Sequence, residues 1–414
     1  MSQSVIVIGG GVVGTSCAYY LTRAGWNVTV IDRGAIGGGS SAGNCGFVCP
    51  SHVLPLTEPG MVGKGLASLF QKNSALKVKF RLDPALWSWM YHFARRCNER
   101  DMLEAARGIQ PILESSLHLY QQLMKDEALD CEWHERGLFF VYRDRKEFDA
   151  YAPTDRLLDE KFHCPAERIE GDAVLEREPA LKPGLAGGWY YHEDAHLRPD
   201  RLMKAWRANV EASGGTFREN CGFQGFIRKN GSASAVKTTQ GELTADAFVM
   251  AAGAWTPMLA EGLGCKVPIQ PGKGYSITMP RPKICPNVPM IFPETRVAVT
   301  PFDSGYRLGS TMEFAGYDET IDPSRLKILR DGAAPYLQEP EAEPVQQTWF
   351  GWRPMTYDGL PIIDRAPAIN NVMIAAGHNM LGLSMATGTG KLVAEMLNGD
   401  EPLIDPKPYR STRF

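Results

Sequence analysis

The stretch from residue 5 to residue 32, VIVIGGGVVGTSCAYYLTRAGWNVTVID, constrains the fold more than any other part of the chain. Val5–Ile8 is an unbroken β-branched run, typical of a strand that is buried on both faces. A helical spacing of apolar residues follows and stops at Gly25, and a second apolar run covers Val28–Ile31. The pattern predicts a strand, a helix and a second strand that belong to one parallel sheet.

Three glycines where the first strand passes into the helix form the motif G-x-G-x-x-G, which indicates dinucleotide binding. Gly9 permits a tight turn, Gly11 lets the backbone approach a pyrophosphate, and Gly14 allows close packing of helix and strand. Asp32 ends the second strand, at the spacing where a carboxylate accepts the ribose hydroxyls of an adenosine. An ordinary glycine-rich turn is the alternative, but the complete unit favours dinucleotide binding. The carboxylate disfavours a 2′-phosphate and hence NADP, so NAD and FAD both remain open.

Composition excludes several classes of protein. A length of 414 residues suggests about two to three domains, and 44% hydrophobic with 22% charged residues is typical of a globular protein. A net charge of -3 without a long basic run argues against nucleic-acid binding. No apolar run reaches about 18 residues and no signal peptide opens the chain, so we expect a cytoplasmic protein. The nine cysteines are scattered, so we expect no metal site and no disulfide framework.

A glycine- and serine-rich segment, residues 34–52, follows Asp32 directly. Its flexibility and the polar groups of Ser40, Ser41 and Asn44 would let it wrap closely around a cofactor. A mobile surface loop is the equally weighted alternative.

Residues 60–125 are expected to be mostly helical, with their most aromatic part at residues 84–93. Because Arg95 and Arg96 follow, this part could be an interfacial helix on a membrane. Packing in a core is the favoured interpretation.

The rest of the sequence contains one more segment of the first parallel sheet and a region that is typical of an antiparallel sheet. Residues 246–255 form a buried strand that breaks into a glycine turn, a second return to the first sheet. Many prolines and short strands in residues 267–348 predict an antiparallel sheet inserted between parts of the first domain. The other predicted elements are strands at 137–142, 217–226, 275–279, 297–301, 306–310 and 372–376, helices at 145–161, 201–213, 324–337 and 384–397, and a hairpin at 229–231.

The segment around the predicted strand 372–376, which also returns to the first sheet, discriminates between NAD and FAD. A glycine-bearing loop, residues 377–383, precedes a helix expected to begin at Ser384. Such an N-terminus would direct its dipole and N–H groups at the loop. A flavin needs such positive partial charges, because its reduction places negative charge near N1 and the C2 carbonyl. A nicotinamide has no such need.

At this point the sequence resembles the FAD-dependent amine and amino-acid oxidoreductases of the D-amino acid oxidase and glycine oxidase type, and most closely the bacterial D-amino acid dehydrogenases. The segments that carry the resemblance span nearly the whole chain: VIVIGGGVVGTSCAYYLTRAG, SSAGNCGFVCP, DAFVMAAGAW, GKGYSIT, WRPMTYDGLPIID and AAGHNMLGLSMATGTGKLVAEML.

The resemblance implies an α/β plus antiparallel β fold, in which an inserted α+β substrate domain interrupts a Rossmann-like FAD-binding domain. The FAD domain would comprise residues 1–80, 195–266 and 349–414, and the substrate domain residues 81–194 and 267–348. FAD would be bound non-covalently. The expected cofactor-binding residues are Gly9, Gly11, Val12, Val13, Gly14, Asp32, Arg33, Ser40, Ser41, Asn44, Cys45, Gly46, Phe47, Phe223, Gly253, Trp255, Gly377, Gly382, Leu383 and Ser384.

Three residues are candidates for binding the substrate or for catalysis. In the family the arginine of the R-P motif holds the substrate carboxylate, and here that is Arg353. Its guanidinium lies among aromatic residues, where bidentate binding of a carboxylate is favoured over a structural ion pair with Asp358 or Asp364. Tyr275 and His378 are equally well explained as packing residues, and His52 is a weaker candidate for the site. The sequence supplies no obvious general base.

The resemblance also implies the reaction. A D-amino acid, with cyclic ones such as D-proline or hydroxy-D-proline included, would lose its α-hydrogen as hydride to flavin N5 and become an imino or 2-oxo acid. A quinone-type acceptor would take the electrons, and a peripheral contact with the inner face of the cell membrane would suit such an acceptor. The alternatives are a glycine or sarcosine oxidase that uses O2, and a non-catalytic flavoprotein subunit.

Overall fold

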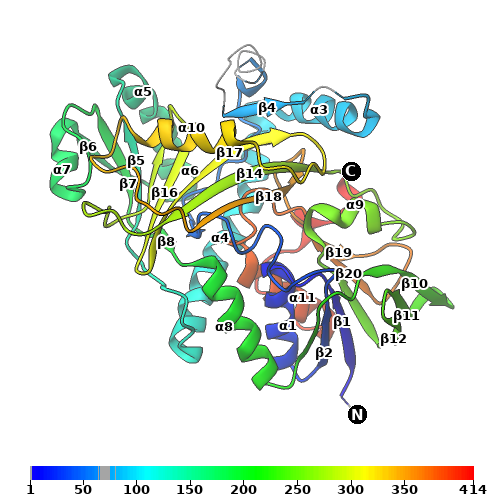
Figure 1. Ribbon diagram of the computed structural model, residues 1–414. Coiled ribbons are helices and arrows are strands. Elements are labelled where there is room, and N and C mark those ends of the chain that lie inside the picture. Colours follow the sequence, from blue (N-terminus) through cyan, green and yellow to red (C-terminus); the bar gives the residue numbers. More distant parts are fainter. Residues whose placement is uncertain (1, 64, 66–74, 80) are drawn as a thin grey trace.

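The computed structural model describes residues 2–63, 65, 75–79 and 81–414. Two large sheets dominate it (Figure 1), a smaller one that contains the N-terminal strand and a larger one made from the middle of the chain. The protein is therefore a mixed α/β structure with both parallel and antiparallel strands. Of the predicted helical region 60–125, residues 64, 66–74 and 80 lie outside the described part.

The six-stranded sheet confirms that residues 246–255 and 372–376 return to the sheet of the N-terminal strands. Its order is β19–β20–β13–β1–β2–β9, with the bounds Ile362–Arg365, Val372–Ala376, Ala247–Met250, Ser4–Ile8, Asn27–Ile31 and Thr216–Arg218. All neighbours are parallel except β19, which pairs antiparallel with β20. Ile6 and Ile8 face one apolar cluster while Val5 and Val7 face another, as expected for a strand buried on both faces.

Helices cover one face of this sheet and a small antiparallel sheet covers the other. The covering helices are α1 (Val12–Arg23), α4 (Glu99–Glu127), α8 (Pro199–Ala212) and α11 (Ala386–Asn398). The small sheet is β10–β11–β12 (Phe223–Lys229, Ser232–Thr238 and Gly241–Thr244), and its first turn is the predicted hairpin.

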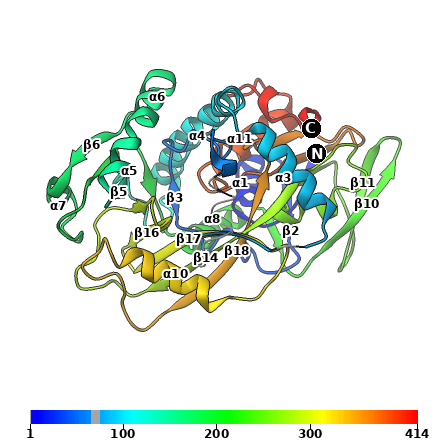
Figure 2. The same ribbon diagram turned by 90° about the horizontal axis from the view of Figure 1, so that it is seen from above.

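The nine-stranded sheet is mainly antiparallel. Its path is β18–β14–β17–β16–β15–β5–β7–β6, with bounds Gln347–Thr356, Ile269–Met279, Gly305–Phe314, Val297–Phe302, Met290–Phe292, Leu138–Tyr142, Gly187–Tyr191 and Glu167–Glu170, and β4 (Leu76–Val78) pairs with β17. Helix α10 (Pro323–Ala333) packs against it, as the view from above shows (Figure 2). A two-stranded ribbon joins β3 (Phe47–Val48) to β8 (Ala195–His196).

Other α-helices in the described part of the chain are α3 (Pro84–Arg96), α5 (Arg145–Ala150), α6 (Ala152–Phe162), α7 (Val174–Arg177) and α9 (Thr256–Leu259). The helical stretch predicted over 145–161 is divided into α5 and α6, because the first helix ends before Tyr151 and Pro153 lies in the first turn of the second. The predicted strand 217–226 is also two strands in different sheets, β9 and β10.

Two further predictions are corrected by the structure. The short strand β4 lies in the region expected to be helical, although Leu76 and Val78 alternate with lysines at the period of a strand. Helix α11 begins at Ala386 rather than Ser384, because residues 382–385 form a turn in which Met385 N–H donates to Leu381 O at 2.8 Å.

Helix α11 packs closely on α1 at Gly390. A Cβ atom placed there would lie 2.3 Å from Ser16 Oγ and 2.6 Å from the Ser16 carbonyl carbon. Only a residue without a side chain therefore lets these two helices meet.

We predict that Gly390→Ala lowers the free energy of unfolding by roughly 1–3 kcal/mol, the usual cost of overpacking a core. Gly63→Ala is the control, because no atom of the described residues lies within 4 Å of a Cβ atom at Gly63. Urea denaturation of the two variants and the wild type measures the difference. Equal stability of all three would contradict the close packing of α1 on α11.

Candidate active site

A cavity of about 960 Å³ lies between the two large sheets, at the upper end of the range for small-molecule sites. Residues that follow β1, β2, β13 and β20 line one side, and strands of the larger sheet line the other. Crevices beyond the carboxyl ends of parallel strands are the usual ligand sites of open α/β sheets.

The cavity brings together most of the residues predicted from the sequence. The predicted residues that line it are Gly9, Gly11, Val12, Val13, Asp32, Arg33, Ser40, Ser41, Asn44, Cys45, Gly46, Phe47, Phe223, Gly253, Trp255, Tyr275, Arg353, His378, Gly382, Leu383 and Ser384. Gly14 and Gly377 do not line it. A Cβ atom at Gly14 would lie 1.9 Å from Gly9 O, and one at Gly377 would lie 2.7 Å from Thr356 Cγ2, so both serve packing.

The first turn of α1 faces the cavity. The backbone N–H of Val12 donates to Ser41 Oγ at 2.9 Å, which fixes the glycine- and serine-rich segment against the helix N-terminus. The Asp32 carboxylate accepts hydrogen bonds from Gly10 N–H at 2.8 Å and Gly34 N–H at 2.9 Å. The helix dipole, free N–H groups and a fixed carboxylate together fit the phosphates and ribose of a dinucleotide.

Residues 40–46, which we name the clasp, are held by side chains of the larger sheet. Arg307 Nη1 donates to Asn44 O at 2.6 Å, and Ser276 Oγ donates to Gly43 O at 2.7 Å. Thr300 Oγ1 donates to Cys45 O at 2.7 Å. These hydrogen bonds hold the clasp in place and disfavour the mobile surface loop, while its contact with a cofactor stays a prediction.

Asn44 organises the clasp from within. Its amide group donates to Ser41 O at 2.8 Å, and its Oδ1 accepts from Gly46 N–H at 2.8 Å. The Asn44 side chain is thus used by the backbone of its own segment.

Arg353 lies on β18 and extends its guanidinium over Gly274 of the neighbouring strand β14. Nη1 donates to Thr311 O at 2.8 Å, and burial lowers the pKa of the group. The structural ion pairs considered from the sequence are not formed, because Asp358 pairs with Arg413 at 2.7 Å and Asp364 accepts from Ser411 at 2.8 Å. Within the described residues, no carboxylate lies within salt-bridge distance of Arg353.

The carbonyl that holds Arg353 comes from an unusual piece of backbone. Ser310 and Thr311 have φ angles of 117° and 57°, where the ladder between β14 and β17 shifts register. Positive φ is a genuine outlier for a β-branched residue and costs about 1–3 kcal/mol. Strain of this kind at a cavity wall is typical of a site in which the position of a group matters more than local stability.

The other two candidate residues are both hydrogen-bonded inside the protein. Tyr275 donates from its hydroxyl to Glu313 Oε2 at 2.8 Å, and its ring belongs to a buried apolar cluster. His378 Nε2 lies 2.9 Å from Thr389 Oγ1 in α11, and burial lowers the pKa of His378 to about 3. His378 is therefore neutral near pH 7, and the catalytic roles of both residues stay predictions.

Ser384 connects α11 to the N-terminal part of the chain. Its hydroxyl donates to Phe47 O at 3.0 Å and accepts from Cys49 N–H at 3.2 Å. It does not cap α11, whose N-cap residue is Met385.

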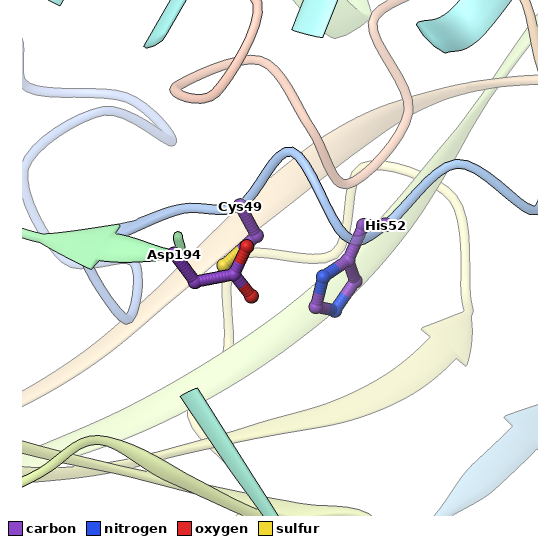
Figure 3. A group of neighbouring side chains, drawn as sticks. All are labelled: Cys49, His52 and Asp194. Carbon is purple, nitrogen blue, oxygen red and sulfur yellow. The ribbon is translucent and has the colours of Figure 1, made fainter. Parts of the chain in front are cut away.

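Sequence reasoning missed one group of titratable side chains beside the cavity. Cys49, His52 and Asp194 offer ligand-type atoms that all lie within 4.8 Å of one another (Figure 3). Cys49 and His52 line the cavity, and the Asp194 side chain is fully buried. In the sequence Asp194 stands between Glu193 and Ala195, and no pattern there distinguishes it from an ordinary surface acid. The prediction that the protein carries no metal stays a prediction.

The comparisons with known proteins identify the family. The model of the FAD-dependent oxidoreductase (DAO) family matches residues 4–396. The chain belongs to this family of FAD-dependent oxidoreductases. It is similar to the D-amino acid dehydrogenase of Agrobacterium fabrum, with 32% identity over 420 residues that cover 100% of both chains. It is also 31% identical to the D-amino acid dehydrogenase of Paramagnetospirillum magneticum, over 100% of this chain and 99% of the relative.

Solved structures share the fold at lower identity. The glycine oxidase of Geobacillus kaustophilus superposes with a TM-score of 0.80 at 21% identity and covers 100% of both chains. The L-proline dehydrogenase of P. horikoshii has a TM-score of 0.75 at 21% identity, over 100% of this chain and 98% of the other.

The donor groups around the cavity fit FAD, the cofactor of the family. The N-terminus of α1 suits the pyrophosphate and Asp32 suits the ribose, while the end of the cavity near His378 and α11 remains for the flavin ring. When bound, FAD supplies a two-electron acceptor.

The position of the Arg353 guanidinium can be tested through its contact with Gly274. A Cβ atom at Gly274 would lie 2.2 Å from Nη1, so Gly274→Ala must displace this flexible side chain. We predict that KM for the substrate rises about tenfold or more, since each 1.4 kcal/mol of lost binding is a factor of ten. Arg353→Leu should raise KM further. Steady-state kinetics measures both effects, and an unchanged KM in either variant would contradict the assignment.

Proposed function

We propose that the protein oxidises D-amino acids to imino acids, which hydrolyse to 2-oxo acids when the substrate is linear. The observation that carries the proposal is the Arg353 guanidinium, which lines the cavity and is held by a backbone carbonyl instead of a carboxylate. Nη1 is occupied by Thr311, so Nε and Nη2 form the pair of donors that would bind a substrate carboxylate in the bidentate manner. The D-configuration rests on the names of the relatives.

The protein's side chains would bind and orient the substrate, and none of them would form a covalent bond with it. Arg353 would anchor the carboxylate and thereby set the α-carbon against the flavin end of the cavity, and such positioning can supply much of the rate. His378, being neutral and hydrogen-bonded to Thr389, would present an uncharged surface beside the ring.

We also propose the domain division predicted from the sequence, with an interrupted Rossmann-like FAD domain and an inserted substrate domain. In support, the six-stranded sheet takes its strands from residues 4–31, 216–250 and 362–376. The strand β18, residues 347–356, belongs to the larger sheet and crosses the proposed boundary at residue 349.

A quinone-type acceptor is proposed over O2, because the relatives that match this chain over its full length at about 31% identity are named dehydrogenases. The oxidase alternative rests on the fold shared with glycine oxidase. A non-catalytic subunit is disfavoured, because a buried guanidinium without a carboxylate partner is costly to retain unless a ligand binds it.

Anaerobic bleaching of the bound flavin tests the function directly. We would mix the holoenzyme with D- and L-amino acids, D-proline, cis-4-hydroxy-D-proline, glycine and sarcosine, and then measure peroxide and reduction of a water-soluble quinone in air. Bleaching by D-amino acids with little peroxide supports the proposal. Bleaching only by glycine or sarcosine favours the oxidase, and no bleaching at all favours the non-catalytic subunit.

A peripheral membrane contact through α3 is a separate part of the proposal. In the described residues, no helix combines the length and the apolarity needed to span a bilayer. Helix α3 packs by Leu86 and Trp89 but exposes Trp87 and Tyr91, whose side chains are 45% and 60% accessible. Exposed aromatic residues with arginines at the helix end suit the interface of an anionic bilayer.

We predict that Leu82→Ser combined with Tyr91→Ser reduces binding to phosphatidylglycerol vesicles at least threefold. These two residues are chosen because Leu82 is 92% exposed, whereas the Trp87 indole donates to Arg81 O. Leu403→Ser is the control, since Leu403 is also exposed, at 58%. Vesicle co-sedimentation measures binding, and no binding by the wild-type protein would remove α3 from the proposal.

A further inference from the structure

A buried hydrogen-bonded chain leads from the cavity wall to Asp194. Ser51 donates to the Asp194 carboxyl from both its backbone N–H, at 3.1 Å, and its hydroxyl, at 2.5 Å. The same hydroxyl oxygen lies 3.3 Å from His52 Nδ1. His52 in turn lines the cavity, where its ring meets Phe140 edge-on at 5.9 Å.

The order of donors in this chain fixes the tautomer of His52. When Asp194 is ionised it can only accept, so the Ser51 hydroxyl must point its proton at Asp194. The Ser51 oxygen can then only accept from His52, which places the imidazole proton on Nδ1. Nε2 is left as an unprotonated acceptor, and no described residue donates a hydrogen bond to it. Burial lowers the pKa of His52 to about 4, so the ring is neutral.

We infer that Asp194, through Ser51 and His52, is the acceptor for the proton that the substrate ammonium must lose before it can be oxidised. This inference rests on the proposed function. The ammonium N–H proton passes to His52 Nε2, the Nδ1 proton to Ser51 Oγ, and the hydroxyl proton to Asp194 Oδ2. The substrate becomes a neutral amine and Asp194 a neutral acid, with no change in electron count.

The surroundings of Asp194 suit an acceptor that works near neutrality. Burial raises its pKa to about 7, against the lowering effect of the hydrogen bonds from Ser51 and Cys49. The titratable groups that face this carboxyl, or the thiol beside it, are Cys45, Cys49, Cys164, Glu193, Tyr190, Tyr191 and His52. Burial raises the pKa of Cys49 well above its usual value, so its thiol stays protonated.

The same three side chains resemble a metal-binding set, but their hydrogen bonds favour the relay. Both Asp194 oxygens already accept hydrogen bonds from Ser51, and the Cys49 sulfur lies beside the carboxyl group as a protonated thiol (Figure 3). A metal ion would require Cys49 as a thiolate and Asp194 freed from Ser51.

The pH dependence of flavin bleaching distinguishes the relay from a structural role. Because Asp194 accepts a proton only when ionised, we predict that the wild-type rate constant is high above pH 7 and falls as the pH drops through about 7. Asp194→Asn should lower the rate at pH 8 by about 100-fold and abolish the fall of the rate near pH 7. Ser51→Ala removes the middle hydroxyl of the relay but keeps His52 and Asp194, and its rate should also lose this dependence on pH.

Matched controls keep the interpretation specific. Glu193→Gln removes the exposed neighbouring carboxylate. The bleaching rate of this variant should still fall as the pH drops, with the midpoint at a slightly lower pH than in the wild type. Dialysis of the wild-type holoenzyme against EDTA should leave the profile unchanged, and a change would indicate a metal and overturn the relay. The visible spectrum of bound FAD and the circular dichroism report whether each variant is folded.

A second readout does not depend on turnover. In wild-type protein labelled with 15N-histidine, NMR at pH 8 should show His52 as the Nδ1–H tautomer. Wild-type bleaching together with an unaltered profile in Asp194→Asn and Ser51→Ala would refute the relay. Absence of bleaching by every amino acid would instead refute the proposed function, and an Nε2–H tautomer of His52 would then refute the relay separately.

Discussion

The hydrogen bonds that hold the clasp carbonyls are the interactions on which the site depends. Arg307, which is fully buried, donates to the backbone of residues 42 and 44, and Ser276 and Thr300 secure residues 43 and 45. On its other side the clasp supplies Ser41 to the first turn of α1. The clasp thus binds side chains of the larger sheet on one side and the helix that follows the first strand of the smaller sheet on the other, and it lines the cavity between the two sheets.

The clasp separates two kinds of electrostatic environment. At the end of α1, partial charges of the backbone and the Asp32 carboxylate suit the dinucleotide. Beyond the clasp, Arg353 places a positive charge on the cavity wall, and Asp194 is a buried acid beside the cavity. A zwitterionic amino acid matches this arrangement, because its carboxylate and its ammonium group need opposite partners.

The sequence predicted the features that rest on local pattern. The glycine motif, the carboxylate at Asp32 and the returns at β13 and β20 follow from periodicity and glycine spacing, and the structure has each of them. It could not predict that Tyr275 would bond to Glu313, since that pairing depends on the neighbour across the ladder. Asp194 was missed for the same reason, because its partner Ser51 lies in a distant part of the chain, and only the fold shows that both are buried.

The hydrogen bonds of the clasp have a consequence for the entropy of ligand binding. Arg307, Ser276 and Thr300 hold its backbone on one side, and Val12 N–H binds Ser41 on the other. The conformational entropy of these residues is therefore lost when the protein folds. A ligand that enters the cavity has no flexible segment to order at this wall, so more of its contact energy is retained as affinity.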